Sequence, residues 1–165
     1  MILIGIGANL PSSKFGAPPQ SLEAALQQLS DAGVAIVARS RWYRSAPVPA
    51  SDQPFYVNGV ARIATTLEPK PLIELLHGIE ARFGRVRGTR NAPRPLDLDL
   101  LAYDERLSQP GDPGPELPHP RLHERAFVLR PLAEVAPAWR HPRLGRSVAE
   151  MLAQLPPDAV AEPLA

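Results

Sequence analysis

Apolar residues in the first quarter of the chain follow the periods of a strand and then of a helix. Residues 2–8 are apolar with glycine at alternate positions and end at Asn9-Leu10-Pro11, which predicts a buried strand followed by a turn. Between Ser21 and Gly33, leucine and alanine recur every three or four residues, which predicts an amphipathic helix. Residues 34–40 then alternate as a second strand.

In the middle of the chain, the apolar residues again follow first a strand pattern and then a helix pattern. Residues 56–66 alternate as a third strand, and Pro69 begins a helix whose apolar face predicts an end at Gly84. Residues 96–101 alternate as a fourth strand, and its two acidic residues lie on one face. The order strand, helix, strand, strand, helix, strand predicts an α/β (α+β) sandwich of ferredoxin-like type, with helices packed on a mostly antiparallel central sheet.

The last third of the chain is richer in turns. Residues 124–134 and 147–155 predict short helices, and the tail after Pro156 is expected to fray. Because 165 residues make one ordinary domain and no linker divides them, we expect a single domain over residues 1–165.

Composition narrows the class of protein. Hydrophobic residues make up 44% and charged residues 21%, which is typical of a soluble folded chain and excludes a disordered polyelectrolyte. The absence of cysteine excludes disulfides and thiolate chemistry, and it fits a reducing compartment. Neither a membrane span nor a secretory signal is recognisable in the sequence. We therefore expect a cytoplasmic protein without a membrane partner. We also expect a monomer, although these features do not determine the oligomeric state.

The strongest local signal is the pair Asp97 and Asp99. Residues i and i+2 of a strand project from the same face, so two carboxylates lie a few ångströms apart and repel each other unless a cation joins them. Such hard oxygen ligands suit Mg²⁺, which binds one or two carboxylates and completes its shell with waters and phosphates. A polar strand face exposed to water is the alternative interpretation of the same pattern.

Five arginines precede these acids in the chain. Guanidinium groups beside a carboxylate pair indicate a site for a polyphosphate that carries Mg²⁺, because arginine binds phosphate oxygens in a bidentate manner. The arginines are Arg82, Arg85, Arg87, Arg90 and Arg94. A basic surface that binds nucleic acid is the competing interpretation, but the chain lacks the aromatic pattern of RNA-recognition motifs and only 5% of its residues are aromatic.

Other motifs give weaker signals. Leu10 stands where a dinucleotide-binding fingerprint needs its third glycine, and no P-loop occurs. His119 lies between two prolines and by position alone is a loop residue. Tyr56 and Asn58 share one face of the third strand, where a phenol and an amide could contact a polar heterocycle.

The segment from Arg90 to Leu100 closely resembles the signature of the 6-hydroxymethyl-7,8-dihydropterin pyrophosphokinases, which transfer pyrophosphate from ATP to a pterin alcohol in folate biosynthesis. The resemblance covers most of the chain, with further similar segments in the same order at residues 4–10, 43–47, 52–58, 84–87, 118–121 and 125–129. It implies a ferredoxin-like fold with ATP and two Mg²⁺ ions beside a pterin pocket.

The resemblance also implies roles for individual residues. Asp97 and Asp99 would hold both Mg²⁺ ions, and together with the phosphate-contacting Arg85 and Arg94 they form the expected catalytic set. The nucleotide side would include Glu80, Arg87, Leu100, His119 and Arg125. The pterin pocket would be lined by Ser45, Ala46, Val48, Tyr56, Asn58 and Phe127. The partners expected from this resemblance are the two small-molecule substrates, ATP and the pterin, with no nucleic acid.

Two other functions remain open from the residues themselves. One is a different Mg²⁺-dependent nucleotidyl- or phosphotransferase, because the acids and arginines specify a polyphosphate better than they specify its acceptor. The other is a basic ferredoxin-like module that binds nucleic acid, for which a steep salt dependence of binding is the signature.

Overall fold

The computed structural model describes residues 1–46, 54–85 and 94–164. Their helices and strands follow the order β1 (Ile2–Ala8), α1 (Gln20–Asp31), β2 (Ala35–Arg39), β3 (Tyr43–Ser45), β4 (Tyr56–Ala64), α2 (Pro69–Arg82), β5 (Asp97–Tyr103), α3 (Ala126–Val135), α4 (Val148–Ala153) and β6 (Glu162–Pro163). A short 3-10 helix over Leu122–Glu124 precedes α3.

The strands form one six-stranded sheet in the order β5-β1-β4-β3-β6, and β2 pairs with the same edge of β4 as β3 does. All the pairings are antiparallel. Strand β1 is central, and its register places Gly7 opposite Asn58 of β4 on one side and opposite Asp97 of β5 on the other. Residues Asn58 and Asp97, from two different strands, therefore flank Gly7 near the end of β1.

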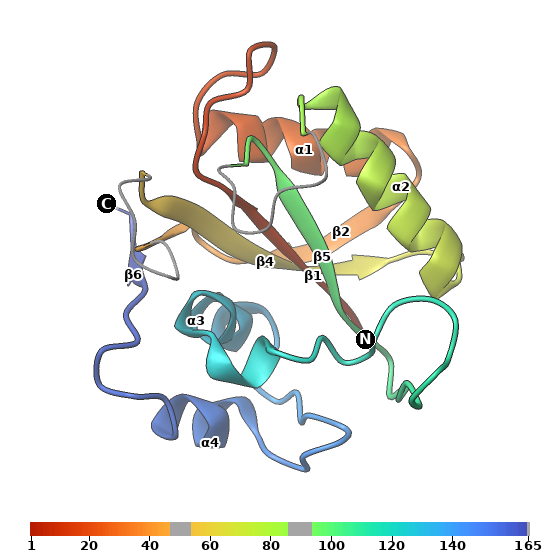
Figure 1. Cartoon of the computed structure of the whole chain (residues 1–165), viewed down its shortest axis with the longest axis vertical. Helices are drawn as coiled ribbons and strands as arrows, with labels where there is room; N and C mark the ends of the chain where they lie inside the picture. Colours follow the sequence, from red (N-terminus) through yellow and green to blue (C-terminus); the bar gives the residue numbers. More distant parts are fainter. Residues whose placement is uncertain (47–53, 86–93, 165) are drawn as a thin grey trace.

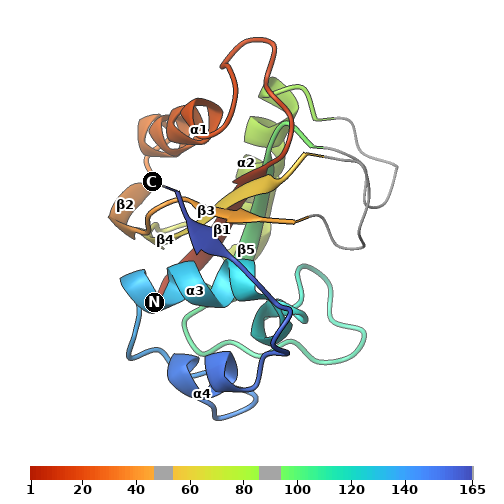
Figure 2. The same ribbon diagram turned by 90° about the vertical axis from the view of Figure 1, so that its left-hand side faces the viewer.

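Helices cover both faces of the sheet. Helices α1 and α2 lie on one face, and α3 and α4 lie on the other (Figures 1 and 2). Because side chains alternate along β1, Ile4 and Ile6 pack in the core beneath α1 and α2, whereas Leu3 packs in the core that includes α3 and α4. The predicted α+β sandwich with a mostly antiparallel sheet is confirmed.

The structure adds two short strands that the sequence pattern did not predict. Strands β3 and β6 have three and two residues, too few to show a period, and each is defined by its pairing with a neighbour. The chain after Pro156 was expected to fray. Instead, β6 pairs with β3, and Ala161 is buried against Tyr43 and Ala126.

One hydrogen-bonded contact joins β3 to α3. The carboxylate of Glu134 accepts hydrogen bonds from the Tyr43 hydroxyl and from the backbone and side chain of Arg41, the latter two at 2.9 and 3.1 Å. Burial and the bond to Glu134 raise the pKa of Tyr43, which keeps the phenol neutral. This contact fixes α3 against β3, the strand that carries Ser45.

No helix in the described part of the chain is long and apolar enough to cross a membrane.

A buried histidine makes the stability of the fold depend on pH. His141, 4% exposed between α3 and α4, accepts hydrogen bonds at Nδ1 from the backbone N–H groups of Arg143 and Leu144. Burial, with the nearby His123 and Arg143, lowers its pKa to about 4. The unfolded chain therefore takes up a proton below about pH 6.5 that the folded chain does not take up until about pH 4.

We predict that the free energy of unfolding decreases as the pH falls from 6.5 to 4, by up to about 1 kcal/mol per pH unit from this residue. In His141→Asn, the amide oxygen can replace the Nδ1 acceptor without titrating, so this part of the slope should disappear. Urea unfolding at several pH values measures how the free energy of unfolding depends on pH. Equal slopes in wild type and His141→Asn would contradict the assignment to His141.

Candidate functional site

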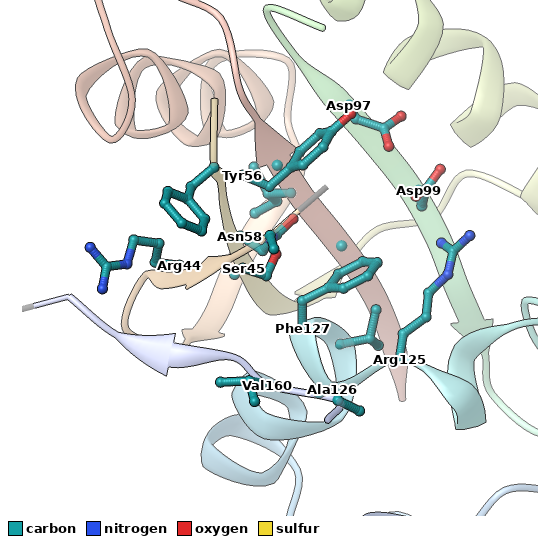
Figure 3. A pocket seen from close by; sticks show the side chains of 18 of the residues that line it. Arg44, Ser45, Tyr56, Asn58, Asp97, Asp99, Arg125, Ala126, Phe127 and Val160 are labelled. Atoms are coloured by element: carbon teal, nitrogen blue, oxygen red, sulfur yellow. The ribbon is translucent and has the colours of Figure 1, made fainter. Parts of the chain in front are cut away.

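A pocket of about 530 Å³ lies above the end of the sheet, on the face that α3 covers (Figure 3). Its walls come from β1, β3, β4, β5, the start of α3 and the segment after α4. The pocket thus collects residues from both halves of the chain.

The acidic side of the pocket is the beginning of β5. Asp97 and Asp99 line the pocket, whereas Leu98 and Leu100 point to the opposite face and are buried beneath α1 and α2. The predicted placement of both carboxylates on one strand face is confirmed. Their position in the wall of a pocket disfavours the interpretation as a plain polar surface.

Asp97 is bound from two directions by arginines. Its Oδ1 lies 2.6 Å from Nη1 of Arg85, and its Oδ2 lies 3.2 Å from Nη1 of Arg94. Arg85 also pairs with Glu80, which is 1% exposed and accepts a hydrogen bond from the backbone N–H of Leu98 at 2.8 Å. Burial alone would lower the pKa of Arg85, but Asp97 and Glu80 outweigh it and raise that pKa.

The surroundings of Asp99 raise its pKa. Burial and the charge of Asp97 raise the pKa of Asp99 to about 7, and the guanidinium of Arg125, which points toward it in Figure 3, counteracts this shift. The described residues contain no group of three or more metal-binding side chains. A pair of carboxylates is nevertheless sufficient for Mg²⁺, which commonly completes its shell with waters and substrate phosphates.

The opposite side of the pocket carries two aromatic rings and an amide. Figure 3 shows Tyr56 and Phe127 on either side of Asn58 and Ser45. Nδ2 of Asn58 donates a hydrogen bond of 2.9 Å to the Ser45 hydroxyl, and both residues are buried. Burial raises the pKa of Tyr56, so the phenol is neutral. This side suits a flat ring with hydrogen-bonding groups on its edge.

Gly7 makes room for that amide. A Cβ atom at Gly7 would lie 2.5 Å from Oδ1 of Asn58, closer than real Cβ contacts allow. The same atom at Gly5 would meet only Leu101 side-chain carbons, at 3.6 Å or more, which is ordinary contact. The glycine at position 7 is therefore required by its neighbour on β4.

Asn9 is a residue of the site that the sequence pattern showed only as the end of a strand. It is 4% exposed, and its Oδ1 accepts a hydrogen bond of 2.8 Å from the backbone N–H of Arg94. Its Nδ2 donates to the carbonyl of Pro54 at 3.4 Å, and its own backbone N–H donates to the Arg94 carbonyl at 3.0 Å. The Asn9 side chain thus ties the backbone of Arg94 to the entry of β4.

The other expected site residues fall into three groups. Ala46 and Arg125 line the pocket with those described above. Glu80, Arg85, Leu100 and His119 are not among its lining residues. Of these, Glu80 and Leu100 have buried side chains, so any nucleotide contact of Leu100 would have to come from its backbone. Val48 and Arg87 lie outside the described residues.

His119 is held beside the pocket by its own backbone. Its N–H donates to the carbonyl of Leu101 at 2.8 Å, and its Nδ1 accepts from the backbone N–H of Arg121 at 3.2 Å. Burial and the charge of Arg125 lower its pKa to about 4. At neutral pH the ring is therefore uncharged and carries its proton on Nε2.

Comparisons with known proteins point to one family. A family model described as 7,8-dihydro-6-hydroxymethylpterin-pyrophosphokinase matches residues 3–137. Proteins named 2-amino-4-hydroxy-6-hydroxymethyldihydropteridine pyrophosphokinase are similar to the chain in Synechocystis sp. (37% identity, 96% of this chain and 77% of that protein) and Pseudomonas aeruginosa (40% identity, 96% and 94%). The folic acid synthesis protein fol1 of Pneumocystis carinii is 34% identical over 90% of this chain, which corresponds to 19% of that longer protein.

The two glycines of β1 provide a matched pair of variants. We predict that Gly7→Ala lowers the free energy of unfolding by about 1–3 kcal/mol, because the new methyl group collides with Asn58. Gly5→Ala, two residues away on the same face, should change it by no more than about 0.5 kcal/mol. Urea unfolding of both variants checks this, and equal stabilities would show that Asn58 moves aside freely.

Proposed function

The chain belongs to the 7,8-dihydro-6-hydroxymethylpterin-pyrophosphokinase family, and on that premise we propose how its pocket transfers pyrophosphate from ATP to the hydroxymethyl group of 6-hydroxymethyl-7,8-dihydropterin. The products are AMP and the pterin pyrophosphate, an intermediate of folate biosynthesis. The observation that carries the proposal is the meeting of two unlike walls in one pocket. The carboxylates of β5 and Arg94 face an aromatic slot built by Tyr56, Phe127 and Asn58.

The arginines provide the phosphate side of the reaction. Arg94 lines the pocket and its side chain is 28% exposed, whereas the Arg85 side chain is 12% exposed and is shared between Asp97 and Glu80. Both guanidiniums can exchange carboxylate oxygens for phosphate oxygens, since these are equivalent acceptors. We therefore assign direct phosphate contact first to Arg94. Arg85 comes second, because its guanidinium is also paired with Glu80. Arg125 adds positive charge on the side of Asp99.

The proposed metal ligands are Asp97 and Asp99, for two Mg²⁺ ions. When bound, the ions supply positive charge that offsets the phosphate oxygens and the developing charge of the transfer. The two carboxylates, at positions i and i+2 of one strand, both line the pocket and would hold the ions where the two walls meet.

The aromatic slot provides the acceptor side. Tyr56 and Phe127 would contact the faces of the bicyclic ring, and Asn58 with Ser45 would hydrogen-bond to its edge. In that orientation the hydroxymethyl oxygen is directed toward the phosphate side and attacks the β-phosphorus in line, with AMP leaving. Arg94 lies where the phosphate side of the pocket meets the aromatic slot, because its charge and that of Asp97 both act on the pKa of the Tyr56 phenol.

No side chain is assigned as a general base. His119 is neutral at physiological pH, and its Nε2–H makes it a hydrogen-bond donor to the nucleotide rather than a cation or a proton acceptor. Because a single chain supplies both walls of the pocket, we propose that the enzyme acts as a monomer. We propose further that it is cytoplasmic and acts on these two small-molecule substrates without a nucleic-acid partner.

Product analysis tests the function. With ATP, Mg²⁺ and 6-hydroxymethyl-7,8-dihydropterin, chromatography should show AMP and pterin pyrophosphate in equal amounts. ADP with a pterin monophosphate would instead show the transfer of a single phosphoryl group.

The two aspartates should matter for turnover far more than for the fold. We predict that Asp97→Asn and Asp99→Asn each lower kcat by about 100-fold or more, because each removes a charged ligand from the phosphate side. The matched control is Asp104→Asn, an exposed residue just after β5 that pairs with the N-terminal amine at 2.7 Å and should keep normal turnover. Normal turnover in either of the first two variants would refute the assignment.

A further inference from the structure

The segment over residues 156–164 forms one wall of the pocket. Asp158, Ala159, Val160 and Glu162 are among the lining residues, and Figure 3 shows Val160 beside Ala126 at the border of the cavity. The family model matches residues 3–137, so this wall is built by chain beyond the matched part.

The segment is fixed along its length. Residues Glu162 and Pro163 pair with Arg44 and Tyr43 of β3, and the N–H of Leu164 donates to the carbonyl of Trp42 at 2.9 Å. The carboxylate of Glu162 also lies 3.5 Å from the Arg44 guanidinium. Figure 2 shows β6 at this edge of the sheet, next to β3.

These contacts bridge two elements of the aromatic slot. Ala161 is 3% exposed and packs with Tyr43 of β3 and Ala126 of α3, and Ala159 and Phe127 pack against the same cluster. Strand β3 carries Ser45, and the first turn of α3 carries Phe127. The segment thus connects the strand that carries Ser45 to the helix turn that carries Phe127.

We propose that residues 156–164 form an affinity- and specificity-determining wall for the acceptor, a flat bicyclic heteroaromatic alcohol. The proposal rests on the function above for the identity of that acceptor. The segment acts on the acceptor alone, since the carboxylates of β5 and Arg94 are positioned by β1, α2 and β5 and do not depend on it. Val160 offers the acceptor an apolar contact, and Ala159 and Ala161 position Phe127.

Two exposed valines give a matched test. Val160 is 54% exposed and lines the pocket, whereas Val37 is 51% exposed on β2 and does not. Isothermal titration calorimetry of wild type, Val160→Asp and Val37→Asp would use 6-hydroxymethylpterin in the presence of Mg²⁺ and a non-hydrolysable ATP analogue. The ATP analogue is titrated separately.

We expect Val160→Asp to raise the Kd for the pterin at least fivefold, with the Kd for the ATP analogue within twofold of wild type. Val37→Asp should leave both within twofold. An unchanged pterin Kd in Val160→Asp would overturn the proposal, as would parallel weakening of pterin and nucleotide. A chain that ends at residue 156 and still unfolds cooperatively should bind the pterin more weakly than Val160→Asp does. If the shortened chain does not fold, the comparison of Val160→Asp with Val37→Asp decides the question.

The proposed function can fail separately from this inference. Wild-type product analysis with the pterin decides whether pyrophosphate is transferred. The calorimetry decides whether the segment contributes to acceptor binding, whatever the products are.

Discussion

The site depends on the repulsion between two carboxylates that the pleat of β5 places on one face. Asp97 is bound by two guanidiniums, one on each carboxylate oxygen, while the half-buried Asp99 beside it has its pKa raised to about 7. Glu80 extends this network below the strand, where it binds both Arg85 and the backbone of β5. The strand is thus anchored by charge at the point where, under the proposed function, its side chains would face a polyphosphate.

The second constraint is how closely the acceptor side approaches this network. Gly7 allows Asn58 to lie across β1, and Asn9, at the end of the same strand, binds Arg94 and Pro54 at once. Under the proposed function, strand β1 would hold the acceptor and the phosphate groups at a fixed separation without contributing a charged side chain. Transfer between two bound substrates requires such a fixed approach, because the attacking oxygen has to be aligned with the phosphorus and the leaving group.

Much of this arrangement could be predicted from the sequence, because it depends on local periods. The alternation around Asp97 and Asp99 determined their common face, and the order of helical and extended segments indicated the sandwich. The aromatic slot was expected only from the family resemblance, since nothing in the local sequence pattern brings Phe127 to Tyr56. Burial of Glu80 beneath β5 and the placement of Leu100 in the helical core depend on long-range packing, which the resemblance alone did not reveal.

The parts that were missed share a physical reason. Strands β3 and β6 are too short to have a period and exist through pairing with each other and, for β3, with β4. The double role of Asn9 comes from partners 45 and 85 residues away, and an asparagine at the end of a strand is otherwise an ordinary turn residue.

A crystal structure with Mg²⁺ and a non-hydrolysable ATP analogue tests the central claim most directly, that Asp97 exchanges its arginine partners when the nucleotide binds. We predict that Arg94 moves from Asp97 to phosphate oxygens and that Asp97 and Asp99 both face the bound Mg²⁺ ions, with Glu80 still paired to Arg85. Phosphates bound away from β5, with both arginine pairs of Asp97 intact, would contradict the account.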